Sequence, residues 1–381
     1  MSRARWEIPT PGLLLDLDQF DRNIERLRSH LAETAANLKL RPHMKTLKSV
    51  KLGHRLTKAL GTDAITVSTL AEAEVYAGAG YRDILYAVGI SPAKLDRVAA
   101  LIRAGIDCQV ITDNQDVSRA IARFSKDSGI AIPVLIEIDC DGHRAGIRSD
   151  EHEKLIAVAS ELNGSADLRG VMTHGGGSYG ASSKGELHAA AEQEVRSVRI
   201  AARILREAGF QAPVISVGST PTALAHVNRT GVSELRAGVF PFFDLVMAGI
   251  GVCDVSEIAL SVVTSVIGHQ RQKGWILCDA GWMALSRDRG TQSQAQDCGY
   301  GLVCDVEGRA IPNLIVASTN QEHGILAMRE GSDTAMADIP IGTQLRILPN
   351  HACATAAQHG GYNVTSKRSR RIQWFERFSG W

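Results

Sequence analysis

Eight short apolar runs, separated by amphipathic or alanine-rich segments, occupy the chain between residues 36 and 238. This alternation is typical of βαβα units, in which helices join parallel strands. One intervening segment opens with Thr69 and an acidic Glu72, which together predict the start of a helix. The runs have the length of buried strands and begin at Leu38, Ala64, Ile84, Cys108, Val134, Gly170, Val214 and Glu234. Eight such units favour a TIM (β/α)8 barrel.

A doubly wound sheet is the alternative α/β arrangement. It would place a Gly-x-Gly turn after its first strand and a switch point within the sheet. The first apolar run instead ends in Arg-Pro-His-Met-Lys, residues 41–45, which contain no glycine. The barrel is therefore preferred.

The pattern changes near Ile258, from which β-rich segments follow one another with few helical stretches. These segments span residues 259–270, 274–281, 300–308, 313–324 and 343–353. They predict a second, mainly antiparallel domain. The opening run Gly12-Leu-Leu-Leu-Asp-Leu is also strand-like. We therefore expect a barrel at residues 26–250 and a β-rich domain formed by residues 1–25 and 251–381.

Charge and cysteine usage narrow the classes of partner. The chain of 381 residues carries 42 Lys and Arg against 41 Asp and Glu. Its net charge is therefore too small to attract nucleic acid or an anionic membrane. Small polar ligands fit better. The seven cysteines are odd in number and scattered, as in a cytoplasmic protein. The N-terminus has no apolar signal core, and the run Val239 to Cys253 is short and interrupted by Asp244, so we expect neither secretion nor a membrane span.

Lys45 ends the first predicted strand, and active sites of TIM barrels lie at the C-terminal ends of the strands. Strand alternation would put Arg41, His43 and Lys45 on one side. A lysine in the barrel mouth suits Schiff-base chemistry, although a solvated loop lysine fits the sequence equally well. Lys48 is a rival, but we expect it to begin the next helix and face away.

A phosphate site is predicted after the seventh and eighth strands. Gly218 permits close approach of a ligand, Ser219 and Thr220 supply hydroxyls, and a helix is expected to start at Pro221 behind a Thr220 cap, with free N–H groups. After the eighth strand, Gly238 and Val239 provide a second backbone approach. These two loops are the usual phosphate site of TIM barrels. Each segment alone fits a plain helix start equally well, and the two together favour phosphate.

Further polar residues follow the fifth and sixth strands. Arg144 could bind a cofactor phenolate, and His174 or Tyr179 could stack or transfer protons. Each is also compatible with a structural loop role.

Near the C-terminus, His351 and Cys353 stand two residues apart at the end of an apolar run. In an extended strand both side chains would point to the same side and could hold one ion. Imidazole with thiolate suits zinc or a neighbouring first-row metal, with positions left open for substrate. Alone the motif favours ordinary strand packing, and the upstream lysine and phosphate segments shift the interpretation toward a metal.

Together these motifs resemble the fold-type III pyridoxal-phosphate enzymes acting on D-3-hydroxy amino acids, a family of dehydratases and aldolases. The resemblance spans nearly the whole chain. It is carried by Thr10-Pro-Gly, RPHMKTLKS from Arg41, DGHRAG from Asp141, THGGGSY from Thr173, VGSTPT from Val217, ELRAGVF from Glu234, DAGW from Asp279, QEHG from Gln321 and PNHACAT from Pro349.

The resemblance implies an alanine-racemase-like barrel with pyridoxal 5'-phosphate attached to Lys45. It also implies a divalent metal (zinc, manganese, cobalt or magnesium) on His351 and Cys353, cofactor or substrate contacts from Arg144 and Tyr179, and a homodimer. The expected reaction is β-elimination of a D-3-hydroxy amino acid, such as D-threo-3-hydroxyaspartate, D-serine or D-threonine, to a 2-oxo acid and ammonia. The family's aldolases tend to carry His-x-Asp where this chain has His-x-Cys, which favours a dehydratase. A retro-aldolase and a non-catalytic pyridoxal-phosphate carrier remain the alternatives.

Overall fold

The computed structural model describes residues 8–34, 37–335 and 338–381, and these divide into two compact units. The first comprises Arg26–Gly238 with Ser379–Trp381, and the second comprises the chain up to Glu25 with Val239–Phe378. The predicted barrel ended later, at residue 250. Residues 239–250 group with the second unit because Leu245 and Val246 donate N–H bonds of 3.0 and 3.2 Å to the carbonyls of Pro349 and Asn350.

The first unit is a parallel eight-stranded barrel, as the sequence predicted. The strands lie in the order β2, β10, β9, β8, β6, β5, β4, β3. Their bounds are β2 Lys39–Leu40, β3 Ala64–Val67, β4 Asp83–Gly89, β5 Asp107–Thr112, β6 Pro133–Asp139, β8 Asp167–Thr173, β9 Val214–Val217 and β10 Glu234–Leu235, with β7 Ile147–Arg148 paired to β6. The N–H of Thr66 donates to Pro42 O at 2.9 Å, and His43 bridges Thr66, so that β2 also meets β3.

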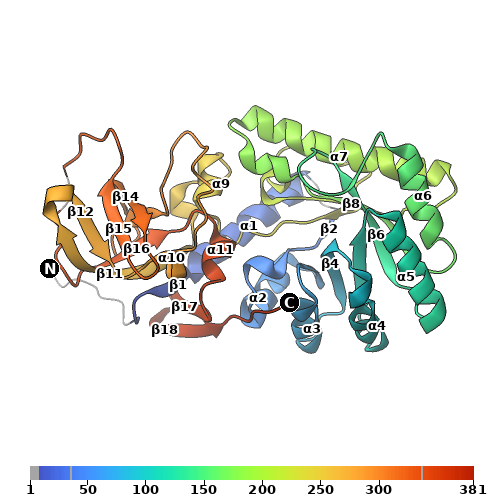
Figure 1. Cartoon of the computed structure of the whole chain (residues 1–381), viewed down its shortest axis with the longest axis horizontal. Helices are drawn as coiled ribbons and strands as arrows, with labels where there is room; N and C mark the ends of the chain where they lie inside the picture. The colour runs from blue at the N-terminus through green and yellow to red at the C-terminus, as the bar shows by residue number, and fades with distance from the viewer. Residues whose placement is uncertain (1–7, 35–36, 336–337) are drawn as a thin grey trace. The chain divides into compact units, whose positions relative to one another are not determined.

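Helices cover the outside of these strands (Figure 1). They are α2 Val50–Leu60, α3 Leu70–Gly78, α4 Leu95–Arg103, α5 Gln115–Ser128, α6 His152–Leu162 and α7 Lys184–Glu207. The short α8 Thr220–Ala223 follows β9. α1 Leu17–Thr34 runs through the boundary between the units. The predicted Thr69 cap is confirmed, since its side chain accepts the N–H of Glu72 at 3.0 Å.

The barrel interior combines an apolar cluster with a buried ionic network. The cluster consists of Leu85, Ile111, Leu135 and Met172, each at most 2% exposed. The network centres on Arg41, which is 2% exposed and pairs with Glu234 and Asp83 at 2.6 Å each. Arg41 therefore supports the barrel from inside instead of facing the mouth beside Lys45.

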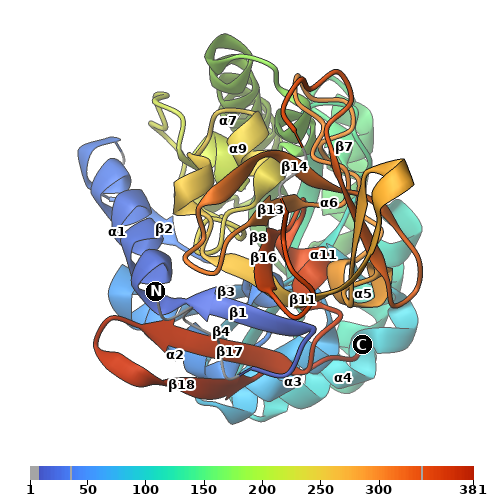
Figure 2. The ribbon, with the colours of Figure 1, turned by 90° about the vertical axis from the view of Figure 1, so that its left-hand side faces the viewer.

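The second unit is a mainly antiparallel sheet in the order β12, β15, β14, β13, β16, β11, β1, β17, β18, with an additional pairing of β12 and β11. Its strands are β1 Gly12–Asp16, β11 Leu260–Gln270, β12 Trp275–Cys278, β13 Leu302–Cys304, β14 Ala310–Thr319, β15 Gly324–Met328, β16 Gln344–Leu348, β17 Gly361–Ser366 and β18 Ser369–Glu376. Short helices α9 Leu245–Gly249, α10 Trp282–Leu285 and α11 Ala352–Ala356 follow strands or loops of this unit. Figure 2 shows β1 beside β17, which joins segments from opposite ends of the chain.

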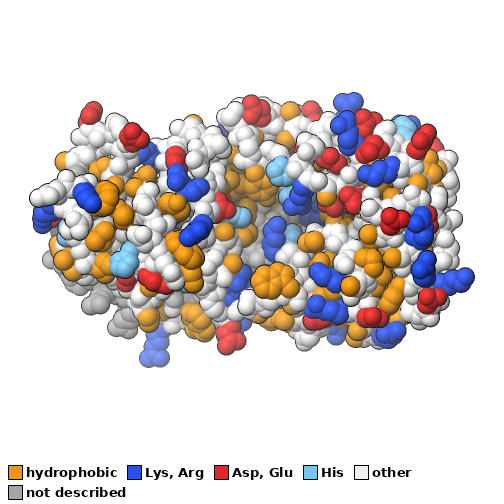
Figure 3. Space-filling view, in the orientation of Figure 1, with side chains coloured by type: hydrophobic (Ala, Val, Ile, Leu, Met, Phe, Trp, Pro, Cys, Tyr) orange, Lys and Arg blue, Asp and Glu red, His pale blue; other side chains and the backbone are white. Residues whose placement is uncertain are grey.

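Acidic and basic side chains are interspersed over the face seen in Figure 3. Among the helices that the structure describes, none combines the length and the apolar character needed to cross a membrane.

Candidate active site

Lys45 lies in a 3-10 turn, Met44–Thr46, that follows the first barrel strand. The regular alternation predicted for residues 41–45 is therefore wrong, because β2 ends at Leu40 and the chain turns after His43. The Lys45 N–H donates to Nδ1 of His43 at 3.4 Å, and the Lys45 side chain is exposed. Lys45 therefore projects from a capped turn at the C-terminal end of the strand.

Lys48 is held elsewhere. Its ammonium lies 3.1 Å from Oε1 of Glu72, a carboxylate with no exposed surface in the first turn of α3. Lys48 has φ of 41°, a left-handed conformation, and precedes α2 rather than beginning it. The ion pair leaves Lys45 as the lysine of this segment that is exposed at the strand end.

Positive charges surround two imidazoles at the mouth. Burial, followed by the charges of Lys45 and Arg236, holds the pKa of His43 well below its usual value. Burial likewise lowers the pKa of His174 to about 3, although its hydrogen bond to Gly218 opposes the shift, and Arg144, Lys45 and Arg236 lower it further. Both rings are thus neutral near pH 7. The cations of Lys45, Arg144 and Arg236 near these rings suit a dianionic phosphate.

The predicted residues Arg144, His174 and Tyr179 all lie in this unit. The exposed Arg144 acts electrostatically on both His43 and His174. The ring of Tyr179, in the 3-10 turn Gly176–Gly180, lies 6.1 Å from that of His174 between centroids. His174 Nδ1–H donates to Gly218 O at 3.0 Å, which leaves Nε2 as the ring's acceptor.

The predicted phosphate segment forms the start of α8, with Ser219 as the N-cap instead of Thr220. A capping box joins Ser219 and Thr222: the Ser219 N–H donates to Thr222 Oγ1 at 3.0 Å, and the Thr222 N–H donates to Ser219 Oγ at 3.2 Å. Pro221 has no N–H. The expectation of several free N–H groups at this helix start is therefore wrong, because the capping box uses two of them.

Gly218 also has its backbone polar groups engaged. Its N–H donates to Glu194 at 3.1 Å, and its carbonyl accepts the His174 ring. At φ of 138° a Cβ on this residue would lie 1.9 Å from the carbonyl oxygen of Arg236. Glycine is required here because β9 and β10 approach closely at this residue. Since the N–H and the carbonyl of Gly218 are already engaged, this residue can serve a ligand only by leaving space beside it.

The second phosphate segment is Gly238 with Val239. The Gly238 N–H donates to Thr220 Oγ1 at 3.3 Å, which ties this segment to α8. A Cβ on Gly238 would meet His43 Cβ at 3.1 Å, a narrow cradle beside the lysine turn. The Val239 carbonyl accepts the N–H groups of Phe242 and Phe243. The hydroxyls, the glycine cradle and the surrounding cations fit a pyridoxal phosphate attached to Lys45.

The metal pair lies in the second unit, and the predicted strand geometry for it is wrong. β16 ends at Leu348, His351 is the N-cap of α11, and Cys353 lies in the first turn of that helix. A hydrogen bond with Cys353 nevertheless contributes to the pKa of His351, so the helical turn still brings the two side chains together.

Asp288 stands behind His351. Nδ1 of His351 lies 2.7 Å from Oδ2 of Asp288, so an ion would be held through Nε2. Burial lowers the pKa of His351, but the hydrogen bonds with Asp288 and Cys353 outweigh it and raise the pKa to about 11. A carboxylate behind a ligating imidazole is the usual arrangement of metal-binding histidines. The donor set of imidazole and sulfur, backed in this way, fits a divalent metal such as zinc.

Two further carboxylates support these segments, and sequence reasoning did not select them. Asp244, 2% exposed, accepts the N–H of Ala352 at 3.0 Å and so fixes the start of α11. Glu194 lies on α7 among buried neighbours. A carboxylate on the apolar face of a predicted helix is a signal that could have identified Glu194. Asp288 and His351 are 63 residues apart, and no sequence signal connects them.

Comparison with known proteins assigns the chain and its fold to a family. A family model described as alanine racemase, N-terminal domain, matches residues 15–245, and a serine dehydratase domain model matches residues 259–365. The chain belongs to the fold-type III pyridoxal-phosphate family, whose barrel is the alanine racemase N-terminal domain.

Within that family the chain is similar to the D-threo-3-hydroxyaspartate dehydratase of Delftia sp. strain HT23. The two are 49% identical over 379 residues, which is 98% of each chain. The solved structure of that enzyme has a TM-score of 0.94 and covers 98% of this chain and 99% of its own. A C353A variant of the Delftia enzyme, solved in a metal-free form, also has a TM-score of 0.94.

Two further relatives have other activities. D-serine dehydratase of Dictyostelium discoideum is 28% identical over 98% of this chain and 97% of its own length. The 3-hydroxy-D-aspartate aldolase of Paracoccus denitrificans strain Pd 1222 is 26% identical over 93% of this chain and 88% of its own length.

Proposed function

We propose that this protein is a pyridoxal-phosphate- and metal-dependent dehydratase of D-3-hydroxy amino acids that releases a 2-oxo acid and ammonia. The observation that carries the proposal is the assignment of the two lysines: Lys48 is paired with buried Glu72, whereas Lys45 is exposed among the cations of the barrel mouth. The 49% identity with the Delftia dehydratase supports the same reaction class.

The chemistry needs an electron sink at Cα and a Lewis acid at the β-hydroxyl, which bound pyridoxal phosphate and a divalent metal supply. Lys45 would hold the cofactor and, once displaced by the substrate amine, take the Cα proton on Nζ. The hydroxyls of Ser219 and Thr220 and the backbone of Gly238 and Val239 would receive the phosphate, with Gly218 permitting close approach.

Arg144 and Tyr179 would orient cofactor and substrate. His174, with a pKa of about 3, is a weak base near neutral pH and suits the role of a fixed hydrogen-bond acceptor through Nε2. His351 and Cys353 would hold the metal, with Asp288 fixing the imidazole.

We further propose D-threo-3-hydroxyaspartate as the preferred substrate, with oxaloacetate and ammonia as products. The support is the identity with the Delftia enzyme and the exposed guanidinium of Arg144, which suits an additional substrate carboxylate.

The direct test is product analysis of the purified holoenzyme with D-threo-3-hydroxyaspartate, D-serine and D-threonine, with metal present and after chelation. We expect ammonia and the 2-oxo acid, formed fastest from the aspartate derivative and only with metal. Glycine would identify the second candidate, a retro-aldolase, which the similarity to the Paracoccus aldolase favours. No turnover of any of the three would support the carrier interpretation, against which the second unit with His351 and Cys353 argues.

We also propose that the enzyme is a cytoplasmic homodimer. The structure describes all seven cysteines and joins none of them in a disulfide, which fits a reducing compartment. Light scattering of the purified protein should give twice the chain mass of 41.0 kDa, and fractionation of the source cells should place it in the cytoplasm.

A further inference from the structure

Glu194 is a buried carboxylate at the centre of the predicted phosphate segments. It lies on α7 and is 1% exposed. Its Oε1 accepts the N–H of Gly175 at 2.8 Å and the N–H of Gly218 at 3.1 Å. Gly218 directly follows β9, and Gly175 is the second residue after β8. One carboxylate oxygen thus joins two neighbouring loops of the barrel mouth.

The same side chain reaches the capping box of α8. Burial raises the pKa of Glu194, and a hydrogen bond from the Thr222 side chain opposes that shift. Thr222 in turn bonds to Ser219, whose Oγ lies 3.0 Å from Oγ of Ser178 in the loop after β8. The hydroxyl of Ser178 also donates to Gly175 O at 2.6 Å. These hydrogen bonds form a continuous ring from Glu194 through Thr222, Ser219, Ser178 and Gly175 back to Glu194.

Glycine at position 175 makes the contact possible. A Cβ there would lie 3.2 Å from Oε1 of Glu194, in the space through which the carboxylate approaches the main chain. Burial of a carboxylate is costly unless its acceptor sites are filled. The Glu194 oxygens are filled by two loop N–H groups, which have no strand partner in the barrel ladder, and by one hydroxyl. The arrangement therefore orders loops that would otherwise carry unpaired buried N–H groups.

We propose that Glu194 is a positioning residue for the phosphate of the cofactor: it fixes the loops after β8 and β9 from the α7 side, so that Ser219, Thr220 and Gly238 are preorganised to receive the phosphate. The inference rests on the proposed function, because it assumes pyridoxal phosphate in the mouth. Glu194 is assigned no contact with the phosphate, because its Oε1 already accepts the N–H groups of Gly175 and Gly218.

The test compares pyridoxal phosphate with pyridoxal, which lacks the phosphate. Binding of each to the apo protein is followed by the visible absorbance of the bound cofactor. In Glu194→Leu the affinity for pyridoxal phosphate should fall at least about tenfold, as expected for loss of hydrogen bonds to a charged group, while the affinity for pyridoxal stays within about threefold. Glu194→Gln, which keeps an acceptor oxygen and the side-chain length, should restore most of the loss.

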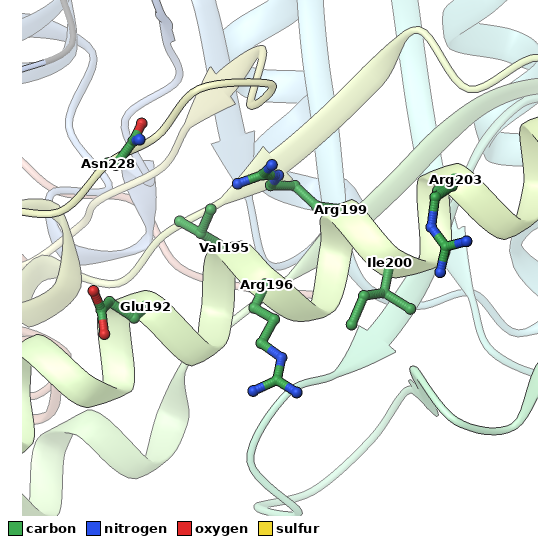
Figure 4. Close-up of a pocket in the computed structure, with 7 residues that line it drawn as sticks. All are labelled: Glu192, Val195, Arg196, Arg199, Ile200, Arg203 and Asn228. Carbon is green, nitrogen blue, oxygen red and sulfur yellow. The ribbon is translucent and has the colours of Figure 1, made fainter.

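Glu192 supplies a matched control on the same helix. It is exposed and lines a groove of about 570 Å3 with Val195, Arg196, Arg199, Ile200, Arg203 and Asn228 (Figure 4). This groove shares no lining residue with the barrel mouth. Glu192→Gln should bind both ligands like the unaltered protein.

If Glu194→Leu fails to fold, Thr222→Val removes the hydroxyl that links the carboxylate to the α8 cap and should give the same selective loss. Equal weakening of pyridoxal phosphate and pyridoxal, or no weakening of either, would overturn the inference and leave Glu194 a purely structural residue. Failure of the unaltered protein to bind pyridoxal phosphate would instead overturn the proposed function.

Discussion

Asp288 and His351 form a carboxylate–imidazole pair, with Oδ2 of Asp288 2.7 Å from Nδ1 of His351. Asn350 helps to hold the pair, because its side-chain amide donates to the backbone oxygen of Asp288 at 3.0 Å. The contact with Asp288 engages Nδ1 and leaves Nε2 as the ring nitrogen available to an ion. The imidazole is therefore already oriented for metal binding.

Replacement of Asp288 by Ala should therefore weaken metal binding without removing a ligand. Loss of such a supporting carboxylate costs about 10- to 100-fold in metal affinity. Zinc titration of the apo protein against a chromophoric chelator measures the change. Asp338→Ala, on an 83% exposed side chain of the same unit, is the control and should bind zinc normally. Unchanged affinity in Asp288→Ala would contradict the supporting role.

Lys45 and Lys48 should differ completely in cofactor attachment. Lys45→Ala should abolish the visible absorbance of bound pyridoxal phosphate, whereas Lys48→Ala should retain it, because the Lys48 ammonium is paired with Glu72. Borohydride reduction followed by peptide mapping locates the label directly. A label on Lys48 would contradict the assignment.

Metal removal should stop turnover but leave the cofactor bound, because Lys45, Ser219 and Thr220 belong to the first unit, whereas His351 and Cys353 belong to the second. Cys353→Ala should behave like chelation in ammonia release and in zinc content. Cys353→Asp should recover part of the metal binding, since a carboxylate oxygen also ligates zinc or manganese. Full ammonia release by Cys353→Ala in metal-free buffer would show that His351 and Cys353 bind no essential metal.

Arg41 should contribute far more to stability than its neighbour Lys39, although both pair with Asp83. Arg41→Leu leaves the buried carboxylate of Glu234 without its ion-pair partner, which should cost about 3–5 kcal/mol in the free energy of unfolding, whereas Asp83 keeps its pair with Lys39. Lys39→Leu removes a pair that is 46% exposed on the lysine side and should cost at most about 1 kcal/mol. Urea denaturation measures both changes, and equal losses would contradict the difference.

The alternation of apolar runs with helical segments was sufficient to predict all eight barrel strands, because most strands of a parallel sheet are buried on both faces and read as near-continuous apolar runs. The Thr69 cap and the change to antiparallel strands after Ile258 are likewise local patterns. The family motifs placed Lys45 and the His351–Cys353 pair in the chain. The local geometry of these residues was harder to predict from the sequence, because they lie in turns where strand alternation has ended.

Sequence alone thus determined the barrel, the second β-rich unit, the cofactor class and the residues that would carry the chemistry, because these depend on periodicity and on motifs of adjacent residues. Only the tertiary structure decided which lysine forms an ion pair, which N–H groups already donate hydrogen bonds, and which carboxylates support the sites. Lys48 with Glu72, Gly218 with Glu194 and His351 with Asp288 are pairs far apart in the chain. Such pairs form only when strands and helices pack, and hydrogen bonding depends on distances between atoms that no local pattern encodes.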